Sequence, residues 1–264
     1  MRSNILKHQR IVIKIGSSSL THDSGLIDLW QMEKLVRQIV NVHNSGKEVI
    51  IVSSGAIAAG MGKMKLRERP QTIPEKQAAA AVGQTALMHM YEKLFSEYGV
   101  GVAQILLTKE DMIETTRATH FKNALNELLN HKIIPIINEN DAVAIDEIKV
   151  GDNDTLSAVV CDLIGFELLI ILSDIDGVFN KDPRTHKDAT QVFDITDIST
   201  LNAIDATDSE SNVGTGGMIT KFNAARILQK GGKHLLIVNS KTENIINHVL
   251  SGERLGTYFN FEKE

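Results

Sequence analysis

The sequence has a single cysteine, Cys161, so no disulfide can form within the chain, which fits a reducing compartment. Its neighbours in SAVVCDLIG are apolar and indicate a packed rather than a reactive thiol. No stretch offers about 18 uninterrupted apolar residues, and the start, MRSNILKHQR, is too short and polar for a signal peptide. These absences favour a cytoplasmic protein that does not insert into a membrane.

The chain also lacks an excess of positive charge. It carries 28 basic and 33 acidic residues, a net charge of -5, so no global field exists to attract nucleic acid or an anionic membrane surface. Two nucleotide-binding fingerprints are missing as well, the GxxxxGK[ST] P-loop and a GxGxxG after the first strand. Any phosphate site must therefore be local and of another type.

Short apolar runs are what the sequence does contain, and they predict buried strands at 11–15, 48–52, 100–107, 132–137, 168–172 and 234–238. Helical periodicity lies between them, most clearly in 28–43, 121–129 and 156–163, with Gly165 as a C-terminal cap. Strands that alternate with helices predict a mainly parallel sheet covered on both faces. The polar stretch 174–191 is predicted to be a hairpin or excursion, and a soft boundary between two lobes is expected near residue 170.

Lys14 stands at the carboxyl end of the first predicted strand, where ligands of parallel sheets collect. A buried ammonium without a partner is costly, so Lys14 is expected to meet an anion. Small residues follow the first two strands, in 16–19 and 53–56, and leave backbone amides open to anions. Each group alone is more simply explained by turn chemistry, but two together favour an anion site.

Acidic and amide side chains follow the fourth strand in INENDAVA, residues 137–144, and recur in GDND, residues 151–154. Asp152 or Asn153 could simply cap a helix that starts near Thr155. Helix capping does not explain why so many carboxylates and amides gather at one end of the predicted sheet. Their number favours a ligand with an ammonium group, or a metal ion.

A glycine-rich group, GTGGMITK at 214–221, precedes a helix predicted from about Met218. Lys221 would lie in its first turn, where a cation opposes the helix dipole unless an anion sits on the glycine-rich start. The plainer alternative is a solvated lysine. Glycine-rich or serine-rich turns with a lysine at each end of the chain predict a polyphosphate held by two cations, as in phosphoryl transfer with Mg²⁺.

Taken together, the motifs KIGSS, VSSGAIAAG, AAVGQ, LLTKED, PIINENDAVA, KVGDNDTLSA, LSDIDGVFNKDPR, GTGGMITK and a final GTYF resemble the bacterial glutamate 5-kinase family of the amino acid kinase superfamily. The resemblance covers essentially the whole chain. It implies an α/β fold, a three-layer αβα sandwich with a mainly parallel central sheet like that of carbamate kinase. It also implies ATP-dependent phosphorylation of the side-chain carboxylate of L-glutamate to L-glutamyl 5-phosphate, the first step of proline biosynthesis.

The same resemblance implies roles for individual residues. Lys14 and Lys221 would act in catalysis on the phosphates, with Asp154 orienting both lysines. Ser54, Asp141 and Asn153 would bind glutamate. ATP would be bound by Lys14, Ser173, Asp174, Thr215, Gly216, Gly217, Met218, Ile219, Thr220 and Lys221. Mg²⁺ would accompany ATP, and no residue is assigned to the metal.

A single amino acid kinase domain over 1–264 is expected, with an amino-acid-binding lobe at about 1–170, a nucleotide-binding lobe at about 171–264 and no RNA-binding PUA domain. Members of the family imply a homo-oligomer, a dimer or tetramer, and feedback inhibition by L-proline. Other readings stay open: a kinase for acetylglutamate, aspartate or a nucleoside monophosphate, or a non-catalytic sensor of amino acids or nucleotides. The family's usual threonine is Ser173 here, which keeps the hydroxyl.

Overall fold

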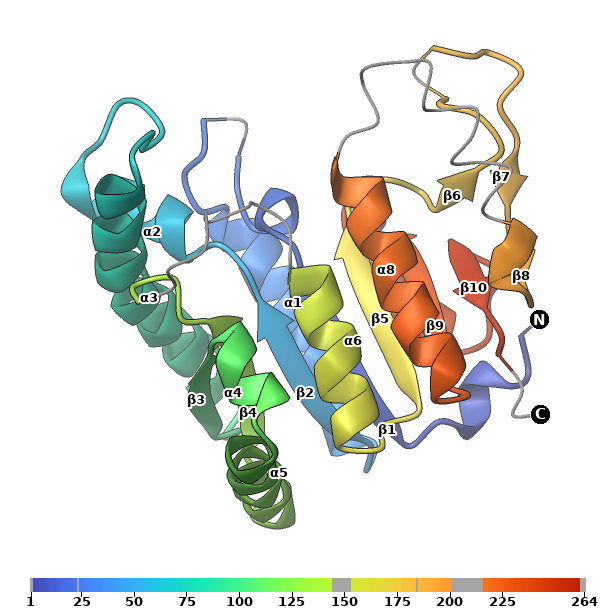
Figure 1. The fold of residues 1–264 in the computed structure, drawn as a ribbon, viewed down its shortest axis with the longest axis horizontal. Coiled ribbons are helices and arrows are strands. Elements are labelled where there is room, and N and C mark those ends of the chain that lie inside the picture. Colours follow the sequence, from blue (N-terminus) through green and yellow to red (C-terminus); the bar gives the residue numbers. More distant parts are fainter. Residues whose placement is uncertain (1, 23, 144–152, 184, 201–215, 262–264) are drawn as a thin grey trace. The chain divides into compact units, whose positions relative to one another are not determined.

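The computed structural model describes residues 2–22, 24–143, 153–183, 185–200 and 216–261. The chain forms two compact units (Figure 1). Unit 1 comprises Met1–Lys14 and Asp154–Glu264, and unit 2 comprises Ile15–Asn153. Both ends of the chain therefore contribute to the same unit.

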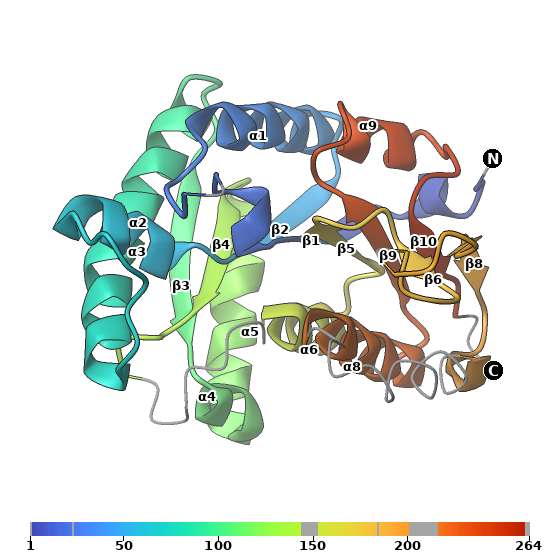
Figure 2. The same cartoon turned by 90° about the horizontal axis from the view of Figure 1, so that it is seen from above.

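Unit 2 is built on parallel strands in the order β3, β4, β2. Helix α1 covers one face of these strands and α5 covers the other (Figure 2). The register pairs Leu107 with Glu139, so the polar residues after β4 lie at the carboxyl edge. The elements are β2 (Glu48–Ser53), β3 (Val102–Leu107), β4 (Ile134–Glu139), α1 (Leu29–Asn44), α2 (Ala56–Met64), α3 (Ile73–Ser96), α4 (Lys109–Ile113), α5 (Thr115–Asn130) and the 3-10 turn η2 (Ser17–Ser19).

Unit 1 contains strands in the order β1, β5, β9, β10, β8. Strands β5 and β9 are parallel, and β10 runs antiparallel to β9. Helix α9 lies on one face, with α6 and α8 on the other (Figure 2). The elements are β1 (Arg10–Ile15), β5 (Leu168–Ser173), β8 (Asp194–Ile195), β9 (His234–Asn239), β10 (Thr257–Phe259), α6 (Asn153–Leu163), α8 (Gly216–Lys230), α9 (Ile245–Leu250) and the 3-10 turns η1 (Ile5–Lys7) and η3 (Ile198–Thr200).

The predicted α/β class with mainly parallel strands and helices on both faces is confirmed. All six apolar runs form strands, β1 to β5 and β9. The side chains of β1, β2, β4, β5 and β9 are mostly buried, whereas those of β3 are mostly half-buried. The polar excursion contains a hairpin in which β6 (Val178–Phe179) pairs antiparallel with β7 (Gln191–Val192). Gly165 has φ +73°, as expected of a helix C-terminal cap. Cys161 is buried in α6, where burial raises its thiol pKa to about 12.

Several predicted boundaries shift; the third strand, for example, begins at Val102 rather than at 100. The fourth strand begins at Ile134 rather than at 132, because Lys132 takes a left-handed φ of +59° in the turn that ends α5. Helix α8 begins at Gly216 rather than near Met218, which places Lys221 in its second turn. The expected lobes at about 1–170 and 171–264 stay a prediction. In the described segments, no helix is both long enough and apolar enough to cross a bilayer.

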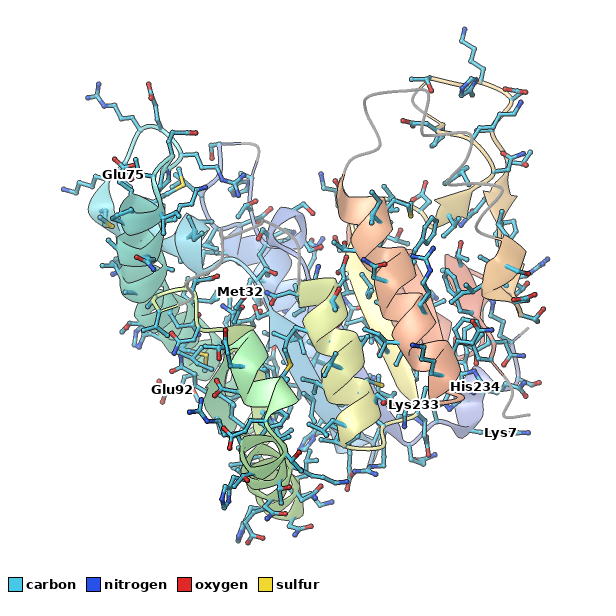
Figure 3. The ribbon with its side chains drawn as sticks, in the orientation of Figure 1. Lys7, Met32, Glu75, Glu92, Lys233 and His234 are labelled. Atoms are coloured by element: carbon cyan, nitrogen blue, oxygen red, sulfur yellow. The ribbon has the colours of Figure 1, made fainter. Side chains whose placement is uncertain are left out.

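Helix α3 starts at a capping box in which Thr72 and Glu75 exchange side-chain and backbone hydrogen bonds. Glu75 and Glu92 lie on its exposed side, whereas Met32 of α1 is buried (Figure 3). The opposite side of α3 packs against α2, where glycines allow the two backbones to approach closely. This contact matters for the site because α2 follows Ser54 directly.

Candidate active-site residues

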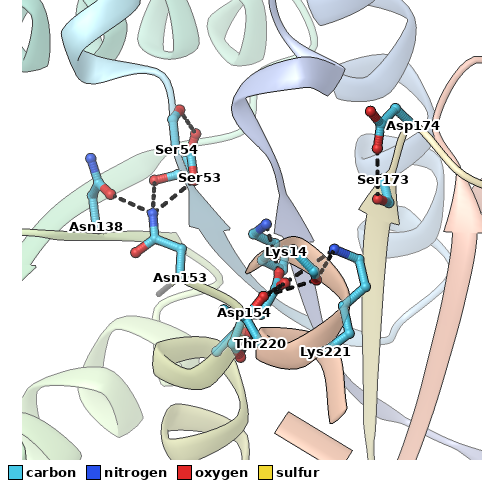
Figure 4. Close-up of polar contacts among 12 residues, drawn as sticks. Lys14, Ser53, Ser54, Asn138, Asn153, Asp154, Ser173, Asp174, Thr220 and Lys221 are labelled. Atoms are coloured by element: carbon cyan, nitrogen blue, oxygen red, sulfur yellow. Dashed lines mark hydrogen bonds and ion pairs between the residues drawn. The ribbon is translucent and has the colours of Figure 1, made fainter. Parts of the chain in front are cut away.

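Two lysines share one carboxylate in unit 1. Lys14 Nζ, from β1, lies 2.7 Å from Asp154 Oδ1, and Lys221 Nζ, from α8, lies 3.2 Å from Asp154 Oδ2 (Figure 4). Thr220 Oγ1 donates to the same Oδ2 at 2.8 Å. We call Lys14, Asp154, Thr220 and Lys221 the lysine cluster. The structure thus brings together the three residues that the resemblance assigned to catalysis.

The lysine cluster is buried and carries a net positive charge. Lys14 and Lys221 are each 7% exposed and Asp154 is 1% exposed, so two ammonium groups face one carboxylate away from bulk water. Burial lowers the pKa of Lys14 although Asp154 opposes that shift. Burial would raise the pKa of Asp154, but the charges of Lys14 and Lys221 outweigh it and lower that pKa. One excess positive charge remains to attract an anion.

The structure confirms the expectation that Lys14 meets an anion, here a carboxylate, and corrects the one for Lys221. Lys14 is not an unpartnered ammonium, because Asp154, 140 positions along the chain, compensates its charge. Lys221 does not oppose the dipole from a first turn; its Nζ bonds Asp154 and also donates to Gly217 O at 3.0 Å. The anion is therefore needed by the pair of lysines together, not by either lysine alone.

Other residues assigned to ATP lie at the carboxyl end of β5 and at the start of α8. Ser173 is nearly buried and donates from Oγ to Asp174 Oδ1 at 3.2 Å, while Asp174 itself is exposed. The Asp174 charge acts on Lys14, whose pKa it raises slightly against the effect of burial. Gly216, Gly217, Met218 and Ile219 form the first turn of α8, and Thr215 lies outside the described residues.

Unit 2 gathers a second polar group at the ends of β2 and β4. Asn153 Nδ2 donates to Ser54 Oγ at 2.8 Å and to Asn138 Oδ1 at 3.0 Å, and it lies 3.4 Å from Ser53 O (Figure 4). We call Ser54, Asn138 and Asn153 the amide cluster. Two predicted glutamate-binding residues, Ser54 and Asn153, are thus hydrogen-bonded to each other.

Asp141, the third predicted glutamate-binding residue, lies in the turn after β4. Burial raises the pKa of its carboxyl to about 6, and no cation among the described residues pairs with it. Asn153 Oδ1 is likewise buried without a hydrogen-bond partner in the described part of the chain. A carboxylate and a carboxamide oxygen that both lack a donor are suited to a ligand with N–H groups.

Sequence reasoning placed Asn138 at the rim without a role and assigned nothing to helix α3. In the structure Asn138 is 2% exposed, and its Nδ2 donates to Gln84 Oε1 of α3 at 2.9 Å. Tyr91, also of α3, is hydrogen-bonded through its hydroxyl to Ser53 Oγ at 2.8 Å. The sequence offered one signal for this pair: Gln84 and Tyr91 are seven positions apart, which puts them on one helix face.

Comparison with protein families adds a direct result: the model of the amino acid kinase family matches residues 9–239. The chain belongs to the amino acid kinase family. Individual relatives are also similar to this chain in sequence. Glutamate 5-kinase of Clostridium tetani (strain Massachusetts / E88) is 52% identical over 96% of this chain and 94% of its own length. Glutamate 5-kinase of Caldanaerobacter subterraneus subsp. tengcongensis is 50% identical over 95% of this chain and 67% of its own.

Solved structures superpose on this chain and show the same fold. Carbamate kinase from Giardia lamblia bound to AMP-PNP superposes with a TM-score of 0.68 at 15% identity, over 97% of this chain and 99% of that one. UMP kinase from Ureaplasma parvum superposes with a TM-score of 0.65 at 18% identity, over 96% and 99% of the two chains. At such identities the likeness concerns the fold alone.

Proposed function

We propose that this amino acid kinase transfers the γ-phosphoryl group of ATP to the side-chain carboxylate of L-glutamate and forms L-glutamyl 5-phosphate. Relatives named glutamate 5-kinase, 46–52% identical over 95–98% of the chain, support this substrate. The observation that carries the proposal is the lysine cluster, whose excess positive charge suits a migrating phosphoryl group.

On the ATP side, Lys14 and Lys221 are the groups that would contact the phosphates. Asp154 holds both ammonium groups by one carboxylate, so neither needs to reorganise when charge develops between the reactants. Thr220 fixes the same carboxylate by a further hydrogen bond. Ser173, Asp174 and the first turn of α8 would contact the rest of the nucleotide.

On the glutamate side, Asp141 and Asn153 Oδ1 supply the two acceptors for the α-ammonium group. The raised pKa of Asp141 reflects a carboxylate that is buried before its cation arrives. Binding of the ammonium would restore the ionised form and recover the cost of burial. Ser54 would contact a substrate carboxylate from the start of α2.

The reaction needs little proton transfer. A glutamate side chain, with an ordinary pKa of about 4.3, is ionised near neutral pH and is already a nucleophile. Its oxygen attacks the γ-phosphorus, the bond to the β,γ-bridging oxygen breaks, and ADP leaves with that electron pair. The obstacle is repulsion between the carboxylate and the triphosphate, which Lys14 and Lys221 offset.

The residues present fit a Mg²⁺ ion carried by the nucleotide. Mg²⁺ retains several waters and binds through phosphates with one or two carboxylates. Asp174 is an exposed carboxylate directly after β5, whereas Asp154 is already occupied by two lysines. The ion would neutralise charge on the β- and γ-phosphates.

Two readouts with ATP, Mg²⁺ and a panel of acceptors test the proposal: ADP formation for every acceptor, and hydroxamate trapping for the acyl phosphates formed from carboxylic acids. We expect turnover with L-glutamate and much less with N-acetylglutamate and UMP, because Asp141 requires a free ammonium. L-aspartate keeps that ammonium and tests the length of the side chain. Preferred turnover of N-acetylglutamate or a nucleotide would assign another kinase activity. Binding of glutamate and ATP without any ADP formation would indicate a sensor instead.

Inhibition by L-proline, assembly into a dimer or tetramer and a cytoplasmic location belong to the same proposal. The first two have a direct measurement. Proline should raise the KM for glutamate in steady-state kinetics, and light scattering of the purified protein should give a mass of two or four chains.

A further inference from the structure

Three side-chain amides connect helix α3 to the end of β2 within unit 2. Asn138 Nδ2 donates to Gln84 Oε1 at 2.9 Å, and Asn153 Nδ2 donates to Asn138 Oδ1 at 3.0 Å. Asn153 Nδ2 also donates to Ser54 Oγ at 2.8 Å. A continuous row of hydrogen bonds thus runs from Gln84 to the amide cluster.

A backbone group sets the orientation of the whole row. Glu139 N donates to Asn138 at 2.9 Å, so the Asn138 atom that it meets must be the oxygen. The Asn138 nitrogen then points to Gln84, and Asn153 must present its own nitrogen to the Asn138 oxygen. The outcome is that Asn153 Oδ1 faces away from the row as a buried acceptor with no partner in the described residues.

Gln84 is the member of this row that lies on α3, and its acceptor stabilises the same orientation of the Asn138 amide that the Glu139 N–H group favours. Asn138 is 2% exposed, so its nitrogen has no water to replace Gln84 Oε1. If the Asn138 amide rotated, two N–H donors would face each other at Glu139 and at Asn153. The Gln84 acceptor and the Glu139 donor therefore hold Asn138 from opposite ends.

Helix α3 is itself fixed against the same strand end. Tyr91, two turns after Gln84 and fully buried, bonds Ser53 Oγ at 2.8 Å. Leu87, between them on this face, is 1% exposed. Gln84 therefore projects from a helix face that packing has already positioned.

We propose that Gln84 is a positioning residue for the amino-acid substrate: through Asn138 it orients Asn153 so that Oδ1 accepts from the substrate's α-ammonium group. This inference rests on the proposed function. It assigns Gln84 no contact with ATP and none with the reacting carboxylate. Loss of the Gln84 acceptor should therefore weaken glutamate binding and leave ATP binding unchanged.

Gln84→Met removes the acceptor at nearly constant length, and Gln84→Glu keeps an acceptor at the same place. We expect Gln84→Met to raise the KM for glutamate about tenfold, since a buried donor is left unsatisfied, with kcat changed less than about threefold. Gln84→Glu should stay within about threefold of the wild type. The side chain of Gln84→Asn is one methylene too short to reach Asn138, so this variant should behave like Gln84→Met. It replaces Gln84→Met in the test if Gln84→Met does not fold. Glu92→Gln, on the exposed side of the same helix, is the matched control.

Glutarate, which lacks the α-ammonium, separates positioning from general damage. In calorimetric titrations, Gln84→Met should lose affinity for glutamate and keep the wild-type affinity for glutarate and for ATP. Equal losses for all three ligands, or an unchanged KM for glutamate, would overturn the role of Gln84 while leaving the proposed function intact. Failure of the wild type to phosphorylate glutamate would instead remove the proposed function.

Discussion

Substitution of Gly83 by alanine is expected to destabilise the protein, although alanine is the better helix former. Gly83 lies on the face of α3 that meets α2. A Cβ atom there would lie 1.7 Å from Ala56 O and 2.3 Å from Gly60 N, both backbone atoms of α2. The first distance is half of the 3.4 Å at which ordinary contact begins, and no side-chain rotation can relieve it. Helix α2 would have to move.

The expected magnitude follows from two opposing effects. Gly→Ala in a helix gains about 1 kcal/mol of intrinsic stability. Overpacking costs about 1–3 kcal/mol and occasionally more, and a clash with backbone belongs at the upper end. We therefore expect a net loss of about 2 kcal/mol. Because α2 begins at Ala56, two residues after Ser54, its displacement should also raise the KM for glutamate.

Gly62→Ala is the matched control, since Gly62 lies in α2 but its added Cβ would meet only the Leu26 side chain, at 3.4 Å. This variant should be neutral or stabilised by up to about 1 kcal/mol. Urea unfolding of both variants, with comparison of m-values, measures the difference. If Gly83→Ala were as stable as Gly62→Ala, the close approach of α2 and α3 would not hold.

Four further predictions concern the site and the helix beside it. Lys14→Ala or Lys221→Ala should lower kcat about a hundredfold, by loss of one preorganised charge, and near wild-type kcat in either would remove that role. The KM for glutamate should rise as pH falls below about 6, where Asp141 takes up a proton in the free enzyme; a flat profile between pH 5 and 8 would contradict its contact with the ammonium. Asp141→Asn should raise that KM. It should also stabilise the free protein at pH 8 by roughly 2–3 kcal/mol but not below pH 4, because the cost of ionising the buried carboxyl begins above its unfolded pKa and is complete only above its native pKa of about 6. Equal unfolding free energies at pH 8 would count against the raised pKa. Tyr91→Phe should lower the free energy of unfolding by about 1 kcal/mol and leave kcat unchanged, because Ser53 Oγ keeps its hydrogen bond to Ser54 O. A large drop in kcat would place Tyr91 in the site itself.

Local sequence predicted the strands well because each is a short apolar run that can be buried only in a sheet covered on both faces. It also placed Lys14 correctly at the carboxyl end of its strand and Ser54 and Asp141 after theirs, since a carboxyl end is defined by where such a run stops. Local sequence did less well at helix starts. Helix α8 begins with two glycines, whose weak helix preference gave no sign that the helix begins at Gly216.

The tertiary structure decided which charged and polar side chains pair with one another. The pairs Lys14 with Asp154, Lys221 with Asp154 and Gln84 with Asn138 are 140, 67 and 54 positions apart. No periodicity connects residues at such separations. Apolar burial along each strand fixed the sheet, and the sequence alone determined that much. Only folding could bring two ammonium groups to one carboxylate and three amides into one row, because hydrogen bonds and ion pairs act over a few ångströms and depend on where the packed elements place their side chains.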